Sequence, residues 1–278
     1  MYEEPNYARD TEFKKLIVRQ SDVDLTRVAL ELARDAYPGL DLDESCEWIK
    51  ARAEELRPGL AVRSELETLA ALSACLSDRY GLTGSPEAYE DPDSSFLNRV
   101  IETGQGIPIS LSVIYMAVAE ELDLPLLGAS APMHFLTRLE TSQGTMFVDA
   151  YAGGRVLTLL ECLDWLKGLT NLSERRLIEA LEPVGPRAII VRMLNNLKVL
   201  YAKNENWPAA WKVQHRLSAL QRSSYNERRD LGIISLHAGR LSLAVDVLNA
   251  CLQKCPKEEK PILEGHLKEA QRQLSEWN

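Results

Sequence analysis

Two residues that could move a proton, His134 and Asp149, each lie at the end of an expected strand. If these strands pair antiparallel, the two side chains are neighbours. A carboxylate beside an imidazole fixes the tautomer of the ring and raises its basicity, as in any nucleophile–His–Asp site. The pair therefore indicates acid–base chemistry, although the same arrangement also serves as a structural hydrogen-bonded pair.

A glycine-containing segment, residues 104–109, opens the most apolar expected helix of the chain, which extends to Leu122. Pro108 suits the first helical turn because its missing N–H would have had no partner there. Ser110 is the nearest hydroxyl and would need strong activation by a base. We therefore treat Ser110 as a weak candidate nucleophile and expect it to act as a helix-cap or packing hydroxyl.

Apolar spacing predicts the elements that must position these residues. Leu126–Leu127, residues 135–138 and residues 144–148 look like strands, and Gln143-Gly144 predicts a hairpin turn. Val156-Leu157 fits a short strand or loop, and a helix begins at Glu161. An α+β fold with a small antiparallel sheet follows. Residues 11–80 are expected to be helical: an apolar stripe begins at Phe13, and a second helix is capped by Ser21 or Asp24 and ends at Tyr37-Pro38-Gly39. Further helices are expected over the ranges 43–56, 66–80, 96–102 and 110–122.

From about Arg187 the chain is expected to be helical to its end, with an internal repeat. Leu197, Ala210 and Leu217 recur 34 residues later as Leu231, Ala244 and Cys251. Together with Gly232 and Pro256, this spacing is typical of tetratricopeptide repeats, whose period is 34 residues. A capping helix is expected over 264–274, and a generic helical bundle is the alternative. We expect two domains, residues 1–180 and residues 181–278.

Composition and spacing argue against several classes of partner and cofactor. The net charge of −9 argues against nucleic acid, because an acidic surface repels phosphates. No apolar run reaches the roughly 20 residues that span a membrane. The five cysteines contain no CxxC pair, no metal-binding spacing occurs, and Gly104-x-Gly106 lacks the third glycine of a dinucleotide loop. We expect a cytoplasmic protein without metal, cofactor or membrane association, with free and mostly buried thiols, among which Cys46 and Cys75 are core or half-buried.

Several motifs together resemble the SirB family, a bacterial family with a transglutaminase-like core and a tetratricopeptide tail. They are Tyr89-Glu90-Asp91-Pro92, Phe96-Leu97-Asn98, Gly106-Ile107-Pro108-Ile109-Ser110-Leu111-Ser112, His134-Phe135-Leu136-Thr137-Arg138 and Gly153-Gly154-Arg155. The resemblance implies a papain-like core in which His134 and Asp149 match two triad positions. It places the cysteine nucleophile at Pro108 or, with one residue of slack, at Ile109. Met133 and Ala150-Tyr151 also depart from the usual glycine and Pro-Phe.

Three functions follow from the resemblance. The first is a non-catalytic regulatory scaffold that binds a protein or peptide through its tail and a degenerate triad site. The second is an amide hydrolase or transferase in which His134 and Asp149 act with Ser110 or with a water. The third, direct contact with DNA, is suggested only by the regulatory name of the family, and the negative charge argues against it.

Overall fold

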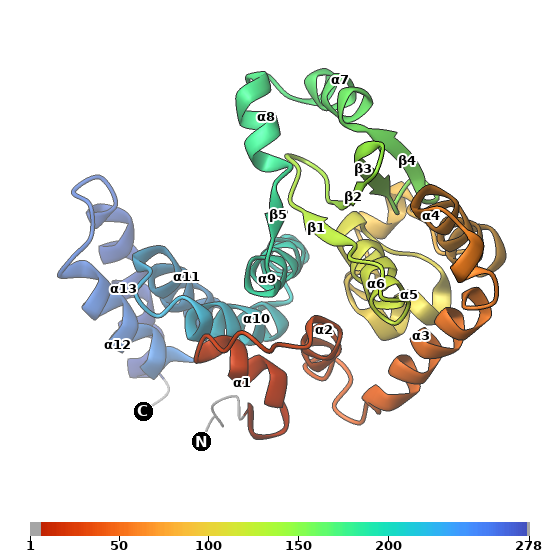
Figure 1. Cartoon of the computed structure of the whole chain (residues 1–278). Helices are drawn as coiled ribbons and strands as arrows, with labels where there is room; N and C mark the ends of the chain where they lie inside the picture. The colour runs from red at the N-terminus through yellow and green to blue at the C-terminus, as the bar shows by residue number, and fades with distance from the viewer. Residues whose placement is uncertain (1–6, 277–278) are drawn as a thin grey trace. The chain divides into compact units, whose positions relative to one another are not determined.

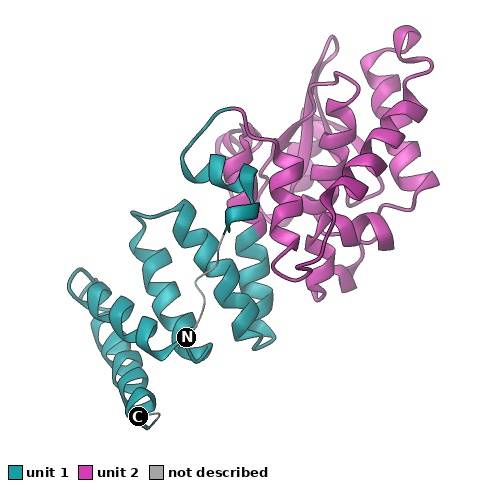
Figure 2. Ribbon diagram, turned by 90° about the horizontal axis from the view of Figure 1, so that it is seen from below, with its two compact units in different colours: residues 1–21, 194–278 teal, residues 22–193 magenta. Residues whose placement is uncertain are grey.

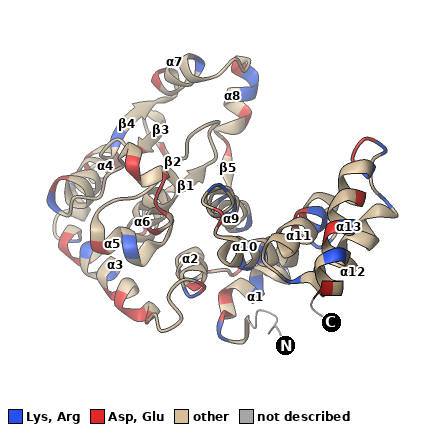
Figure 3. Ribbon diagram, turned by 180° about the vertical axis from the view of Figure 1, so that it is seen from behind, with Lys and Arg blue, Asp and Glu red and all other residues tan. Residues whose placement is uncertain are grey.

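The structure, a computed structural model, describes residues 7–276 (Figure 1). The chain forms two compact units: residues 22–193, and residues 1–21 with 194–278 (Figure 2). This division differs from the expected boundary at 180/181 in two ways. The helical unit resumes at residue 194, and it includes the first residues of the chain. Acidic and basic residues are interspersed over the helices of each unit (Figure 3).

Helices precede the sheet in the unit of residues 22–193. They are α2 (Leu25–Ala33), α3 (Leu42–Leu56), α4 (Glu65–Ser73), α5 (Leu97–Thr103) and α6 (Pro108–Glu120). The expected helix over 66–80 is divided, because α4 ends at Ser73 and a π-helical turn, Ala74–Arg79, follows. Short 3-10 turns lie at Leu60–Val62, Pro86–Tyr89 and Pro92–Ser95. Nearly every residue of α6 is buried, which makes it the central helix of this unit.

A five-stranded antiparallel sheet follows these helices, in the order β4-β3-β2-β1-β5. Its strands are β1 (Leu127–Ala129), β2 (Leu136–Thr141), β3 (Gly144–Asp149), β4 (Arg155–Thr158) and β5 (Pro183–Val184). Strands β2 and β3 form the predicted hairpin, in which Gly144 adopts a φ of 111°. This arrangement confirms the α+β fold, although the sequence did not predict β5.

The alternation of side chains along the strands separates the two faces of the sheet. Leu136, Phe147 and Leu157 share one face, where they pack in a cluster with the buried side of α7 (Leu159–Leu169). Helix α8 (Glu174–Ala180), which the sequence did not predict, adds Leu177 to this cluster. Helix α6 contacts β1 and β2. By alternation, His134 and Asp149 fall on the same face as Leu136 and Phe147, toward α7.

The second unit is helical throughout residues 7–17 and 194–276 apart from its turns. After a 3-10 turn at Tyr7–Arg9, its helices are α1 (Thr11–Ile17), α9 (Pro186–Lys203, which begins in the other unit), α10 (Trp207–Leu220), α11 (Tyr225–His237), α12 (Leu241–Leu252) and α13 (Lys260–Glu276). The repeat positions pack closely: a Cβ added at Gly232 would lie 2.9 Å from Leu248. Ala210 and Ala244 are fully buried. Small side chains at these positions let paired helices approach.

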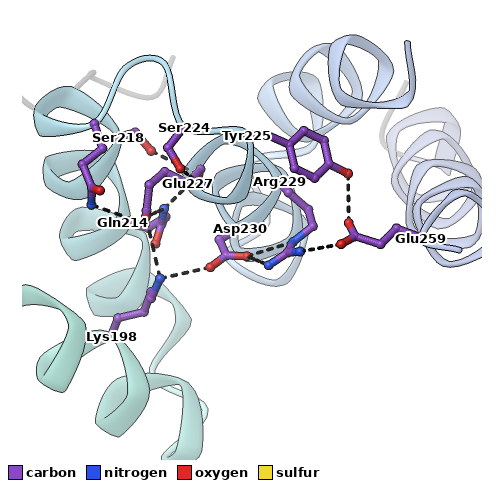
Figure 4. Close-up of polar contacts among 10 residues, drawn as sticks. Lys198, Gln214, Ser218, Ser224, Tyr225, Glu227, Arg229, Asp230 and Glu259 are labelled. Atoms are coloured by element: carbon purple, nitrogen blue, oxygen red, sulfur yellow. Dashed lines mark hydrogen bonds and ion pairs between the residues drawn. The ribbon is translucent and has the colours of Figure 1, made fainter. Parts of the chain in front are cut away.

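Polar side chains link α9, α10, α11 and the turn before α13 (Figure 4). Lys198 Nζ lies 3.0 Å from Asp230 Oδ2, and Arg229 lies 3.0 Å from Glu259 Oε1. Gln214 Nε2 donates to Glu227 Oε2 at 2.8 Å. These contacts join successive helices of the tail.

The N-terminal segment covers α10 through a buried ion pair. Arg216 Nη2 lies 2.8 Å from Asp10 Oδ2, and the guanidinium lies over the rings of Tyr7 and Phe13. Tyr7 Oη and His215 Nδ1 are 2.6 Å apart. The repeat hairpins are therefore covered by α1 at one end and α13 at the other. Within residues 7–276, no helix combines the length and apolar character needed to cross a bilayer.

Candidate functional site

The centre of the candidate site is the hydrogen bond between His134 and Asp149. His134 Nε2 lies 2.8 Å from Asp149 Oδ1, and both side chains are buried, at 7% and 4% exposed. Because an ionised carboxylate only accepts, Nε2 carries the proton, and the lone pair of the neutral ring is then on Nδ1. No hydrogen bond to Nδ1 occurs within residues 7–276. Nδ1 is therefore the ring nitrogen that has no hydrogen-bond partner among these residues.

A tight turn after β3 holds Asp149. The Ala152 N–H donates to Asp149 Oδ1 at 3.2 Å, and the Gly154 N–H donates to the Asp149 carbonyl at 2.9 Å. Gly154 has a φ of 75°, and a Cβ there would lie 2.4 Å from Ser73 Oγ. The Gly153-Gly154 pair therefore lets the turn close against α4 and keeps the carboxylate in place.

Arg192 of α9 holds the irregular segment that carries His134. Its Nη1 donates to Ser130 Oγ at 2.6 Å and to the Ala131 carbonyl at 3.0 Å, and its Nη2 donates to the His134 carbonyl at 2.6 Å. Met133 adopts a left-handed φ of 61° and is 79% exposed. The guanidinium supplies hydrogen bonds to a segment that forms no strand pairing. It therefore holds the backbone of His134, and with it the position of the imidazole.

Aromatic rings surround the imidazole. The ring of Trp165, on α7, meets His134 edge-on at a centroid distance of 5.0 Å, and Tyr151 does so at 5.8 Å. Tyr89 contacts Tyr151 at 5.7 Å and is 47% exposed. Burial raises the pKa of Tyr89, and nearby Tyr151 and Asp149 add to this shift. Ring contacts therefore connect the buried His134 through Tyr151 to Tyr89, which is exposed to solvent over about half of its side chain.

The expected nucleophile position contains no nucleophile. Pro108 is the first residue of α6, and both Pro108 and Ile109 are buried aliphatic residues. Ser110 is fully buried, and its Oγ lies 2.6 Å from the Ser94 carbonyl while it accepts from the Ile107 N–H at 3.1 Å. No hydrogen bond joins Ser110 to His134 in the described part of the chain. The hydroxyl is occupied by capping the helix.

Cys162 is the cysteine that shares an electrostatic environment with Asp149. It is fully buried on α7 in the apolar cluster under the sheet, and burial raises the pKa of its thiol to about 12, with Asp149 adding to the shift. Burial also raises the pKa of Cys46 and Cys75. No hydrogen bond between a cysteine and His134 occurs across residues 7–276. A thiolate is the reactive form of cysteine, so these environments disfavour reaction.

The arrangement can orient an imidazole, offer its Nδ1 lone pair and stack a planar or apolar group on aromatic rings. Residues 7–276 contain no cluster of three or more side chains suited to hold a metal ion. Sequence reasoning did not assign Arg192, Tyr89 or Trp165 to the site. Tyr89 belongs to a motif that was noted, but Arg192 and Trp165 reach His134 only through the fold.

Comparison with known families agrees with this architecture. The model of the transglutaminase-like superfamily matches residues 42–195, and a tetratricopeptide repeat model matches residues 197–270. The first match contains the central helix, the sheet and the His134 site. The second contains the helical hairpins, so it confirms the predicted repeat. No solved structure gives a significant match.

Curated relatives extend over most of the chain. A UPF0162 protein of Xylella fastidiosa is 35% identical over 254 residues, which cover 87% of this chain and 88% of the relative. The UPF0162 protein YchA of Escherichia coli and Protein SirB1 of Salmonella typhimurium are each 27% identical, covering 85% of this chain and 87% of each relative. These relatives confirm the resemblance to the SirB family. The chain therefore belongs to the transglutaminase-like superfamily and to the family of UPF0162 and SirB1 proteins, with a tetratricopeptide-repeat tail.

Proposed function

We propose that this protein is a non-catalytic scaffold of regulatory type, which binds a ligand at the surface around His134 and docks a protein partner through its helical tail. The observation that carries the proposal is the lack of a nucleophilic side chain bonded to His134 within residues 7–276. Acyl transfer through a covalent intermediate needs such a group. When one member of a triad is removed, only a small part of the rate enhancement remains.

The nearest nucleophile candidates support the same conclusion. The Ser110 hydroxyl has its proton directed at the Ser94 carbonyl, and its removal would leave the tip of α6 without a cap. The Cys162 thiol, with a pKa of about 12, is protonated almost completely near neutral pH. Neither group supplies an anion that could attack an amide carbon.

The tail supports the docking role. Helical repeats present extended surfaces to peptides. The cations of its polar network, Lys198 and Arg229, already pair with Asp230 and Glu259 of the chain, so an acidic peptide would have to displace these carboxylates. Together with the net charge of −9, this favours a neutral or basic partner over nucleic acid. The five free cysteines support placement in the reducing bacterial cytoplasm.

An amide hydrolase or transferase that works through water is the second candidate. The unbonded Nδ1 of His134, polarised by Asp149, favours it, because such a nitrogen can take a proton from water. This route needs no serine or thiol, and it shares the imidazole with the binding role.

An assay of glutamine chemistry separates the two candidates. The full chain would be incubated with casein and dansylcadaverine, with ammonia release and dansyl incorporation measured for the unaltered chain, His134→Ala and Asp149→Ala. The scaffold proposal predicts equal background rates for all three chains. Turnover that exceeds background by tenfold or more and disappears in folded His134→Ala would establish an enzyme.

A further inference from the structure

Arg192 is a partly buried cation whose partners are all uncharged: it donates to three oxygens, and its guanidinium lies over the ring of Phe135 at 5.5 Å. Its three hydrogen bonds go to the Ser130 hydroxyl and to the carbonyls of Ala131 and His134. No carboxylate pairs with it in the part of the chain that the structure describes. Arg216, by contrast, is buried against the carboxylate of Asp10. A cation that is taken from water without an anion is costly, so an unmet demand for negative charge remains at this site.

The guanidinium also keeps donors in reserve. Arginine has five N–H groups in a planar fork, and Arg192 uses three of them among residues 7–276. Two N–H groups remain, which is the number that a carboxylate accepts in a bidentate pair. Burial lowers the pKa of Arg192 and only the Tyr89 phenol counteracts this shift, which agrees with a lack of acidic neighbours.

The surroundings of Arg192 supply apolar contacts for the rest of a ligand. Tyr89 interacts electrostatically with both Arg192 and Asp149, and its ring contacts Tyr151. Trp165 and the exposed Met133 complete an apolar surface around His134. Aromatic side chains of this kind bind apolar groups, and the few polar groups among them fix orientation.

We propose that Arg192 forms a carboxylate-binding subsite, so that the site around His134 takes a peptide whose carboxylate adjoins an apolar or aromatic side chain. The inference rests on the proposed function in treating this surface as a binding site. The carboxylate pairs with the free N–H groups of Arg192, and the neighbouring side chain packs on Tyr89, Tyr151 and Trp165. The carboxylates of Asp149 and Glu87 act electrostatically on Tyr151, so we expect the apolar part of the ligand, and not its carboxylate, to lie against that ring.

Three small probes test the subsite in the full chain. N-acetyl-phenylalanine carries an α-carboxylate, its amide N-acetyl-phenylalaninamide carries none, and N-acetyl-aspartyl-phenylalaninamide carries a side-chain carboxylate. Binding is followed by NMR shifts of the His134 imidazole and the Trp165 indole. We expect one acid to bind about tenfold or more tightly than the amide, since a charge-assisted pair is lost in the amide. The better acid identifies the source of the carboxylate.

Variants connect the preference to Arg192. Arg192→Lys keeps the charge but loses the fork, so it should reduce the ratio of acid to amide affinity by several fold. Arg192→Met should bring the ratio to about one. Because Arg192 also holds the His134 segment, Tyr89→Ala serves as the matched control: it should weaken acid and amide alike and keep their ratio.

Equal binding of acid and amide to the unaltered chain, with shifts at His134, would overturn the subsite while leaving the surface a binding site. A lack of shifts with all three probes would overturn it as well. Glutamine turnover that depends on His134 would contradict the proposed function. The carboxylate subsite would still be decided by the ratio of acid to amide affinity.

Discussion

At the scale of single residues, the His134–Asp149 couple satisfies two buried polar groups at once. Asp149→Ala removes the acceptor of His134 Nε2 and of the Ala152 N–H. We expect it to lower the free energy of unfolding by about 2 kcal/mol, because the His134 donor stays buried without a partner, whereas the exposed Ala152 can turn to water. Asp164→Ala is the control, since its carboxylate is 82% exposed and should change stability by less than about 0.5 kcal/mol. Urea unfolding measures both, and equal small changes would contradict a structural role for the couple.

Two buried serines of α6 allow the stabilisation due to helix capping to be measured apart from that due to burial. Ser110→Ala should lower the free energy of unfolding by about 1–2 kcal/mol, because Oγ caps the helix and bonds the Ser94 carbonyl. Ser112 is equally buried, but its Oγ has no hydrogen-bond partner within residues 7–276. Ser112→Ala should therefore leave stability unchanged or raise it. Thermal unfolding of both variants provides the measurement. A larger loss of stability in Ser112→Ala than in Ser110→Ala would refute the capping role of Ser110.

At the scale of elements, the turn between β3 and β4 depends on a residue without a side chain. Gly154→Ala places a Cβ 2.4 Å from Ser73 Oγ, at a position with a left-handed backbone. We therefore expect it to lower the free energy of unfolding by about 1–3 kcal/mol. Gly168→Ala is the matched control, because Gly168 lies in α7 with open space around it and alanine favours helices by about 0.5–1 kcal/mol. In urea unfolding we expect Gly154→Ala to lower the free energy of unfolding and Gly168→Ala to raise it. A neutral Gly154→Ala would show that the turn can relax.

The elements themselves follow from the sequence to a large extent. Helix caps, the Gln143-Gly144 turn and the 34-residue repeat are local signals, and each corresponds to an observed element. Strand β5 has only two residues, and it exists because Pro183 and Val184 pair with β1. Helix α8 is seven residues long and contributes one fully buried apolar residue, Leu177. Such elements depend on tertiary contacts and give no periodic pattern.

At the scale of the whole molecule, the tail needs a cover at each end of its two hairpins, since about three repeats are normally needed for a free-standing array. The first residues of the chain provide one cover through Asp10 and Arg216. Asp10→Ala removes a carboxylate that pairs with a buried guanidinium, so we expect the free energy of unfolding to fall by about 3 kcal/mol. Glu264→Ala, an exposed acid on α13, should have little effect.

Hydrogen exchange of α10 provides the readout for this prediction. Exchange should speed up in Asp10→Ala and stay unchanged in Glu264→Ala. Unchanged exchange in both variants would mean that the N-terminal segment does not stabilise the repeats.

The site was predictable in part. His134 and Asp149 stand at predicted strand ends, so antiparallel pairing alone brings them near. Arg192 lies 58 residues beyond His134 on another element, and a helical arginine carries no signal of its backbone partners. Trp165 fits an ordinary helix core position in the same way. Long-range placement of this kind comes from the fold as a whole.

Intact-protein mass spectrometry after exposure to a fluorophosphonate and, separately, to iodoacetamide at pH 7.5 tests the central claim most directly. We expect no adduct that depends on His134: chains with and without His134→Ala should gain the same mass from each reagent. A single adduct on Ser110 or Cys162 that forms in the unaltered chain and is lost in folded His134→Ala would contradict it.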